Sequence, residues 1–274
     1  MEQWLAKINK LEAWQVACII AVVGLTVFFT GLHNPFMGDD DRQIVSNIPV
    51  HSITNIRLFF EGSTFYNSQG LTPLSGSYYR PLMTTVFSLL YTLFGPHPVY
   101  FHPFQLILYI GGAILLYLFL QKSFGSILSL ALSLVFLVHP VNSQAVFAIP
   151  SMQEGLFFFF GMLAIWSLVR FRSVRSLLFV ALCLFLSLLS KEIGVLFVVM
   201  SALYLFWFDR KRLLAYLSVM VLPIIFYLLL KIHAVGLFAG PNQNIAPIAS
   251  LSLGGRLLTA PAIVLFYITK FIFP

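Results

Sequence analysis

Charged residues are scarce in this chain. Asp, Glu, Lys and Arg make up 9% of the 274 residues, whereas hydrophobic residues make up 59%. This balance excludes an ordinary water-soluble domain, in which about 25% of the residues are charged. Apolar runs of about twenty residues, the length that crosses the hydrocarbon core of a bilayer, recur from Trp14 to the C-terminal end. The composition therefore predicts an all-α polytopic membrane protein.

Cysteine is also rare. Cys18 and Cys183 each lie inside an apolar run, where a structural disulfide is not expected. The sequence contains no Walker loop, GxSxG elbow, HExxH, CxxC pair or dinucleotide fingerprint, so soluble nucleotide chemistry has no support. The formal charge of +7 comes from short basic clusters between apolar runs rather than from one basic face. Nucleic acid is therefore not expected as a partner.

The apolar runs predict about eight spans, and residues 1–274 are taken as a single membrane domain. Lys7 and Lys10 precede the first span and no small-residue cleavage pattern follows it, which indicates an uncleaved first helix. The last span ends at Phe273-Pro274 without a polar tail, so we expect the chain to be truncated on its C-terminal side. The predicted spans are residues 14–32, 104–121, 126–139, 155–169, 176–190, 193–208, 213–230 and 256–273.

A shorter apolar stretch, residues 82–94, decides the orientation of the later spans. If it crosses the membrane, the basic clusters at 170–175 and 209–212 fall on the side opposite to Lys7 and Lys10, which breaks the positive-inside rule. If it lies in the interface as a juxtamembrane helix, ten of the 16 basic residues, Lys122 and Lys270 among them, become cytoplasmic. We therefore predict the second arrangement, in which six of the nine acids and all six histidines face the outer side.

The long segment between the first two spans, residues 33–103, is predicted to be an extracytoplasmic loop. Loops of this length in a compact assembly are usually functional. Residues 44–60 have the apolar periodicity of an amphipathic helix lying on the membrane, with Arg57 directed toward the head groups. We expect this loop to contain juxtamembrane helices.

Asp39, Asp40 and Asp41 follow the first span. Three adjacent carboxylates repel one another, which raises at least one pKa. The cluster has three interpretations: a solvated helix end, a general base that accepts a proton from a hydroxyl, or a divalent-metal site with hard oxygen ligands. Residue types alone do not separate them.

Two cations are predicted at head-group depth. Arg80 stands directly before Pro81, a residue pre-organised for a helix start, and its guanidinium suits the phosphate of a lipid-linked donor. Snorkelling is the simpler interpretation. Lys191 and Glu192 stand between two apolar runs with scarcely any loop. They either neutralise each other, or Lys191 holds a lipid phosphate while Glu192 orients it.

Another predicted outer turn returns polar groups to the same surface. His139 ends one span, and Gln144, Gln153 and Glu154 precede the next. A lone histidine is more often a helix-end residue than a catalyst. The supporting residues of the candidate site are thus Tyr79, His139, Glu154 and Glu192.

Several short motifs occur in an order that resembles the GT-C class of membrane glycosyltransferases. The chain is most similar to the transmembrane and tetratricopeptide-repeat O-mannosyltransferases (TMTC-like) and their bacterial relatives. The motifs are Asp39-Asp40 followed by Ile44-Val45-Ser46-Asn47, then Tyr79-Arg80-Pro81-Leu82, Gly95-Pro96-His97-Pro98, His139-Pro140-Val141 and Ser190-Lys191-Glu192.

The resemblance implies a GT-C-like helix bundle and a mannosyltransferase-like activity. A sugar would pass with inversion from a polyprenyl-phosphate donor to a hydroxyl of a protein, lipid or glycan acceptor on the extracytoplasmic side. Asp39 or Asp40 would be the general base, and Arg80 and Lys191 would hold the departing phosphate. Asp41 is a bystander in this interpretation, and no cofactor is implied. The compact form favours a bacterial inner membrane over the endoplasmic reticulum.

Two positions depart from the family pattern. Gln144 stands where the family commonly has Glu, and Met152 stands where it commonly has Arg. These departures keep open a catalytically inactive GT-C-like membrane scaffold. A transporter or flippase for a lipid-linked substrate is a further alternative, although that class usually shows repeated halves and charges near the bilayer midplane.

Overall fold

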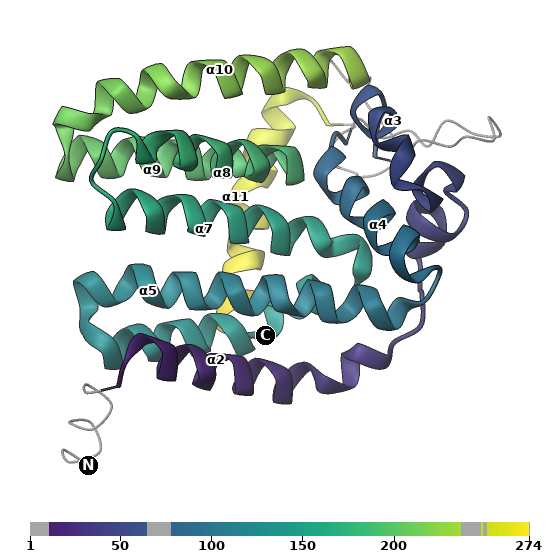
Figure 1. The fold of residues 1–274 in the computed structure, drawn as a ribbon, viewed down its shortest axis with the longest axis horizontal. Coiled ribbons are helices and arrows are strands. Elements are labelled where there is room, and N and C mark those ends of the chain that lie inside the picture. The colour runs from purple at the N-terminus through teal and green to yellow at the C-terminus, as the bar shows by residue number, and fades with distance from the viewer. Residues whose placement is uncertain (1–10, 65–77, 237–247, 249–250, 274) are drawn as a thin grey trace.

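Long helices lie side by side and form the body of the protein in a computed structural model, which describes residues 11–64, 78–236, 248 and 251–273 (Figure 1). Five helical stretches in this part of the chain are long and apolar enough to cross a membrane, and α4, α8 and η7–α9 are shorter apolar helices. The prediction of an all-α polytopic membrane protein is confirmed. The α-helices are α2 (Ala13–Phe28), α3 (Ile56–Glu61), α4 (Pro81–Phe94), α5 (Pro98–Val138), α6 (Gln144–Phe147), α7 (Met152–Arg170), α8 (Ser176–Ser190), α9 (Val195–Phe208), α10 (Arg210–Val235) and α11 (Leu253–Ile272).

Short turns connect or extend these helices. They are η1 (Phe29–His33), η2 (Asp41–Val45), η3 (Ile48–His51), η4 (Ile53–Asn55), η5 (Pro140–Asn142), η6 (Ile149–Ser151) and η7 (Glu192–Gly194). Most of them lie in the segment between α2 and α4 or at the same end of the bundle, where α3 and α4 are inclined to the long helices (Figure 1).

α5 is a hairpin of two arms. Gly125 has φ 72° and ψ 172°, a backbone conformation that glycine adopts readily, and the chain reverses direction there (Figure 1). The Tyr109 hydroxyl on the first arm donates to the carbonyl oxygens of Phe136 and Leu137 on the second, both at 3.0 Å. The two arms correspond to the predicted spans 104–121 and 126–139.

The second arm of α5 is too short to cross a bilayer alone. Residues 126–138 rise about 20 Å at 1.5 Å per residue and end beside Tyr109. η5, α6 and η6 then carry the chain onward to α7. The Gln105 side chain donates to the carbonyl oxygens of Ala145 and Ala148 at 2.6 and 2.8 Å, which satisfies backbone groups at the interruption between these short helices. His139 therefore lies deeper in the bundle than the outer turn expected for it.

Buried apolar side chains form several connected cores. One joins α7 to α8, α9 and α10, a second joins α2 to both arms of α5, and a third joins α4 to η2, η3 and α7. α7 is the central helix of the bundle, whereas none of the residues of α11 is buried. α11 runs across the other long helices in Figure 1 and meets His139 through Phe271. The predicted grouping of Lys270 with the other basic residues is therefore not found.

The expected amphipathic helix over residues 44–60 is wrong. This segment consists of η2, η3, η4 and α3, and only its last turn, from Ile56, is α-helical. Pro49 explains the break, because it lacks an N–H and disfavours helical backbone at Ile48. Ile44, Val50 and Phe59 face the protein core rather than lipid.

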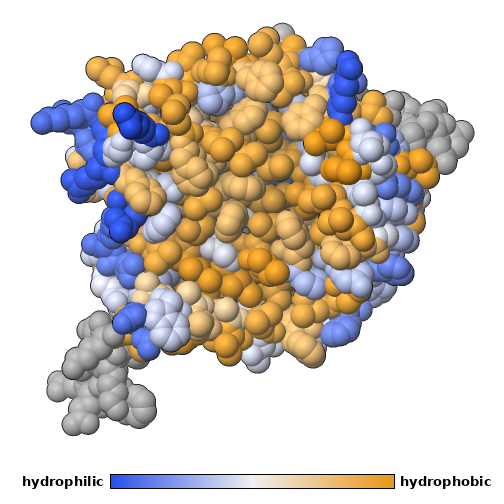
Figure 2. Space-filling model, in the orientation of Figure 1, coloured by the Kyte–Doolittle hydropathy of each residue, from blue (hydrophilic) through white to orange (hydrophobic). Residues whose placement is uncertain are grey.

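A hydrophobic band lies between two hydrophilic ends of the bundle (Figure 2), and the two ends differ in their charged residues. The basic end carries Lys122, Arg170, Arg172, Arg175, Arg210, Lys211 and Arg212. The other end, named the acidic end for its carboxylates, carries Asp39, Asp40, Asp41, Glu61, Glu154 and Glu192 together with Arg42, Arg57, Arg80, Lys191 and Lys231. This separation agrees with the predicted orientation, although Lys7 and Lys10 lie outside the described residues. Which end is cytoplasmic stays a prediction.

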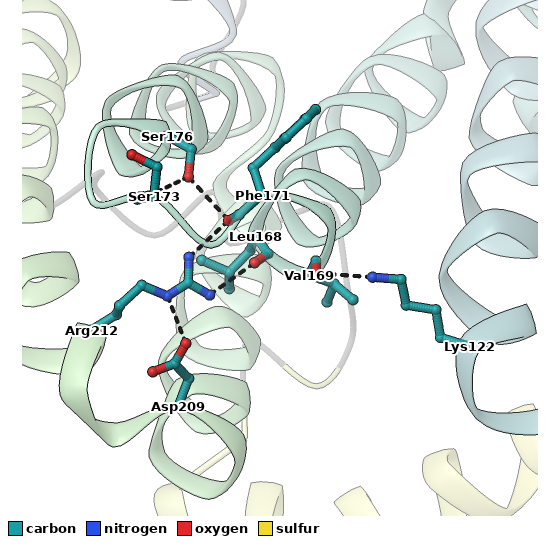
Figure 3. Close-up of polar contacts among 8 residues, drawn as sticks. All are labelled: Lys122, Leu168, Val169, Phe171, Ser173, Ser176, Asp209 and Arg212. Carbon is teal, nitrogen blue, oxygen red and sulfur yellow. Dashed lines mark hydrogen bonds and ion pairs between the residues drawn. The ribbon is translucent and has the colours of Figure 1, made fainter.

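Two cations from other helices cap the C-terminal end of α7 at the basic end (Figure 3). The Arg212 guanidinium donates to the carbonyl oxygens of Phe171 and Leu168 at 2.8 and 3.1 Å and to Asp209 at 2.8 Å. The Lys122 ammonium donates to the Val169 carbonyl at 2.9 Å. Because the last carbonyls of a helix have no partner within it, these contacts tie α5 and α10 to α7.

Candidate functional site

Asp40 is the buried member of the aspartate cluster. Its side chain is 2% exposed, whereas Asp39 and Asp41 are exposed. The Met37 N–H donates to Asp40 Oδ2 at 2.7 Å, and the Asp40 N–H donates to the Met37 carbonyl at 3.2 Å. Burial raises the pKa of Asp40 to about 6, the Met37 hydrogen bond opposes this shift, and the negative charge of Asp39 adds to it. Asp40 can thus take up a proton near neutral pH.

Two more acceptors lie beside Asp40 in sequence. Asp40 Oδ1, Gln43 Oε1 and Asn47 Oδ1 are all buried without a protein hydrogen-bond partner. Burying an unpaired acceptor costs about 1–3 kcal/mol, so three within eight residues call for an explanation. A ligand that carries several hydroxyl groups would supply the missing donors. Asn47 belongs to the motif Ile44-Val45-Ser46-Asn47, whereas Gln43 belongs to no motif. Burial of a polar side chain leaves no pattern in the sequence, so neither residue could be selected from it.

Arg80 begins α4 close to this acceptor group. Asn47 and Thr84 line one small cavity, and the Thr84 hydroxyl and N–H both donate to the Arg80 carbonyl, at 3.4 and 3.3 Å. Asn47 therefore lies beside Thr84, which is one helical turn of α4 beyond Arg80. The structure thus places the start of α4, which carries the predicted cation, near the segment that follows the aspartates.

Two ion pairs connect the start of α4 and the start of α7 to the turn between α8 and α9. Glu192 lies 3.8 Å from Arg80 Nε and accepts from the Tyr79 N–H at 3.4 Å. Lys191 pairs with Glu154 in the first turn of α7. Lys191 and Glu192 thus pair with residues of other helices, and the predicted orientation of Lys191 by Glu192 is not found.

Tyr79 is a buried anchor of this region. Its ring is 0% exposed, and its hydroxyl donates to the Phe60 carbonyl at 3.3 Å. Burial raises the pKa of this hydroxyl, so it stays protonated. Tyr79 packs with Leu188, Leu189 and Tyr227, which joins α4 to α8 and α10. These contacts fix the backbone next to Arg80.

His139 lies apart from these groups. Its Nδ1 accepts from the Val141 N–H at 3.2 Å, its Nε2 lies 2.8 Å from the Phe271 carbonyl, and its ring stacks on Phe271. Both ring nitrogens are engaged with backbone, as in a helix-end residue. Neither ring nitrogen forms a hydrogen bond with Asp40 or Arg80.

The two positions that depart from the family pattern differ in their surroundings. Met152 is 0% exposed and packs in the core that joins α4, η2 and α7. Gln144 is exposed at the start of α6. Met152 therefore contributes packing and could not contact a ligand at the surface.

The fold and these groups define a polytopic helical membrane protein with a polar site at one end of its bundle. Among known proteins, the chain is similar to Protein O-mannosyl-transferase TMTC1 of Mus musculus, with 29% identity over 194 residues that cover 65% of this chain. It is also similar to Protein O-mannosyl-transferases TMTC3 and TMTC4 of Homo sapiens, each 26% identical over 73% and 72% of the chain. The similarity to this family that the motif order predicts is confirmed.

The chain spans only part of these relatives, 21%, 22% and 30% of their respective lengths. No family model matches the sequence, and no solved structure shows a significant match. The O-mannosyl-transferase activity in the names of these relatives is therefore a property of those longer proteins.

Proposed function

We propose that this protein is a GT-C-like membrane glycosyltransferase, which moves a sugar from a polyprenyl-phosphate donor to an acceptor hydroxyl at the acidic end of the bundle. The observation that carries the proposal is Asp40, a buried carboxyl group with one oxygen free of protein partners and a pKa of about 6. Such a group suits a general base. The similarity to proteins named O-mannosyl-transferases makes mannose the first sugar to test and a protein hydroxyl the first acceptor.

The reaction is a single displacement. Asp40 accepts the proton of the acceptor hydroxyl while the oxygen of that hydroxyl forms a bond to the anomeric carbon. The bond from that carbon to the phosphate oxygen breaks, and its electron pair leaves with the polyprenyl phosphate. Arg80 and Lys191 stabilise the negative charge on this leaving group, which needs no acid. Attack opposite to the leaving group inverts the anomeric configuration.

Asp39 is exposed and has a different part in this proposal. Its negative charge contributes to the raised pKa of Asp40. We therefore assign the base to Asp40 and treat Asp39 as a residue that tunes it. Loss of Asp39 lowers the rate, whereas loss of Asp40 abolishes transfer.

The proposal routes no step through a metal, and a divalent metal at Asp39 and Asp40 is the alternative that the assay must separate from it. Transfer measured in excess EDTA is expected to keep its rate. A loss of transfer that Mg²⁺ or Mn²⁺ restores would instead support the divalent-metal interpretation of Asp39 and Asp40.

The test is a transfer assay in membranes that contain the full-length protein, with a panel of radiolabelled polyprenyl-phosphate sugars. We expect label to pass from one donor, mannose first, to a protein fraction. Asp40→Asn is expected to reduce transfer at least 10³-fold, roughly the contribution of a positioned base, and Asp41→Asn serves as the matched control with an unchanged rate. Wild-type rates in Asp40→Asn would refute the proposal.

The assay also separates the alternatives. An inactive scaffold would bind donor without turnover, and a flippase would move labelled lipid between leaflets without releasing the sugar from it. The expectation of a bacterial plasma membrane stays a prediction, and the relatives named above, from mouse and human, lend it no support.

A further inference from the structure

An apolar groove runs between α9 and α10 on the surface of the bundle. Its volume is about 690 Å³, within the range of ligand pockets, and apolar and aromatic side chains of the two helices line it. On α9 it extends from Val198 to Phe206, which is about 12 Å at 1.5 Å per residue. Such a groove accepts a hydrocarbon chain but offers nothing to a polar ligand.

Cationic and hydroxyl groups lie beyond the end of this groove that is nearest the candidate site. Lys231 follows Leu217 and Ile224 at intervals of seven residues, so it lies on the face of α10 that lines the groove. Its ammonium is 6.0 Å from the centre of the Tyr227 ring, which is 6.2 Å from the centre of the Tyr79 ring. Arg80 is the next residue along the chain.

Three nitrogen or oxygen donors at this place lack a matching acceptor. The Tyr227 hydroxyl is buried without a protein partner, in a residue that is 6% exposed. Arg80 Nε is likewise buried without a hydrogen bond, and its nearest carboxylate oxygen, on Glu192, is 3.8 Å away. Within the described part of the chain no carboxylate forms an ion pair with Lys231. Buried donors without acceptors indicate a ligand with several acceptor oxygens.

We propose that the α9–α10 groove holds the prenyl chain of the donor and that Arg80, Tyr227 and Lys231 bind its phosphate. This inference rests on the proposed function, to which it adds a binding site. The phosphodiester of the donor offers two unesterified oxygens and two ester oxygens as acceptors, and Lys231 lies about 9 Å beyond Ile225 along α10, where the apolar lining ends. The prenyl chain then runs from the phosphate directly into the lipid-facing apolar groove.

A second groove on another face of α10 provides a matched control. It is lined by α8 and α10 residues, among them Leu222, and has a volume of about 500 Å³. A separate cavity farther along α10, at Leu230 and His233, is lined by Arg57 and Glu61, which neutralise each other in an ion pair of 2.6 Å. An apolar groove without an unpaired cation at its end has no feature that selects a lipid phosphate.

The experiment is photo-crosslinking of the full-length protein in phosphatidylcholine vesicles with a radiolabelled long-chain polyprenyl phosphate that carries no sugar. A photoreactive residue replaces Ile225 in the α9–α10 groove or Leu222 in the α8–α10 groove; the two side chains are 50% and 76% exposed. We expect label at position 225 to exceed label at 222 at least five-fold. Excess unlabelled polyprenyl phosphate should abolish it, whereas neither polyprenol nor phosphatidic acid should.

Substitutions at the phosphate end sharpen the test. Lys231→Gln and Tyr227→Phe are each expected to reduce the crosslink at position 225 several-fold, and Lys231→Arg to restore it. Arg210→Gln, at the basic end of the same helix, is expected to change nothing. Unchanged labelling in both Lys231→Gln and Tyr227→Phe would overturn the inference.

The outcome is distinguishable from that of the proposed function. Equal labelling at 225 and 222 in a protein that transfers sugar would refute the groove alone. Labelling confined to 225 in a protein that transfers no sugar from any donor would leave the groove standing and refute the transferase.

Discussion

Asp40 differs from its two neighbours by its surroundings rather than by its chemistry. All three are aspartates at the end of the first span, yet only Asp40 faces the protein interior. Ser46 donates to Asp41 at 3.0 Å, which makes Asp41 a local partner of its own turn. The burial of Asp40 destabilises its charged form. Carboxyl groups with pKa values shifted in this way are often found at functional sites.

This burial predicts opposite pH dependences for activity and stability. Transfer should rise with pH through about 6, because the base must be deprotonated. The raised pKa means that the folded state holds the proton more tightly than the unfolded state. Its stabilising contribution is therefore complete below the unfolded pKa of 3.8 and is lost as the pH rises through about 6. The pH–rate profile and denaturant unfolding in detergent measure the two effects.

Asp40→Asn is the variant that isolates this effect. It cannot ionise, so we expect it to be more stable than the wild type by on the order of 2 kcal/mol at pH 8 and equally stable at pH 4. Asp41→Asn should show no such difference at either pH. Equal stability of Asp40→Asn and wild type across this range would contradict the assigned pKa shift.

The short turn between α8 and α9 positions both ion pairs of the candidate site. Lys191 and Glu192 emerge from it toward α7 and α4 respectively. The turn is held against the end of α8 at Gly194, where an added Cβ would lie 2.8 Å from the backbone carbonyl atoms of Ser187. A side chain therefore cannot be accommodated there without moving the turn.

Gly194→Ala is expected to displace this turn. We predict a loss of about 1–3 kcal/mol in the free energy of unfolding, the usual cost of overpacking, together with reduced transfer, because Lys191 and Glu192, the partner of Arg80, both move. Thermal unfolding and the transfer assay measure these effects. Gly254→Ala is the matched control, since an added Cβ there meets nothing within 4 Å; equal losses in both variants would contradict the explanation.

Arg212 stabilises the packing of α10 against the end of α7 at the basic end. Its three hydrogen bonds use the planar geometry of a guanidinium, which a lysine ammonium cannot reproduce. Arg212→Lys is therefore expected to lower the free energy of unfolding by about 2 kcal/mol while transfer by the remaining folded protein is unchanged. Arg210→Lys, at an exposed position on the same turn, should lie within about 0.5 kcal/mol of the wild type.

The bundle presents a hydrophobic band between two hydrophilic ends (Figure 2), one of which is the basic end. Residues far apart in sequence share each end because successive helices alternate in direction (Figure 1). The positive-inside rule then predicts the basic end in the cytoplasm and the candidate site outside.

Cysteine labelling tests this orientation. In a chain with Cys18 and Cys183 replaced by alanine, His97→Cys should react with a membrane-impermeant maleimide in intact cells. Arg172→Cys should react only after permeabilisation; both positions are exposed. The reverse pattern would place the candidate site in the cytoplasm and remove access to a donor on the outer side.

The helices were largely predictable, because each span is a long apolar run bounded by charges or turns. Residues 44–60 and His139 were not, since a proline and a half-length helix arm changed the path of the chain. Arg80 and Lys191 could be selected from their positions next to apolar runs. Their partners Glu192 and Glu154 could not be assigned, and Tyr227, Lys231 and Gln43 were missed, because burial and pairing depend on which helices pack together.

The two ion pairs also bear on how the spent carrier leaves. Arg80 and Lys191 are already neutralised by Glu192 and Glu154 before any donor arrives. An incoming phosphate exchanges places with a carboxylate, so its binding gains less than it would at bare cations. In the proposed reaction the same carboxylates would then return to their partners and displace the polyprenyl phosphate. We therefore expect this arrangement to favour rapid turnover over tight retention of the lipid.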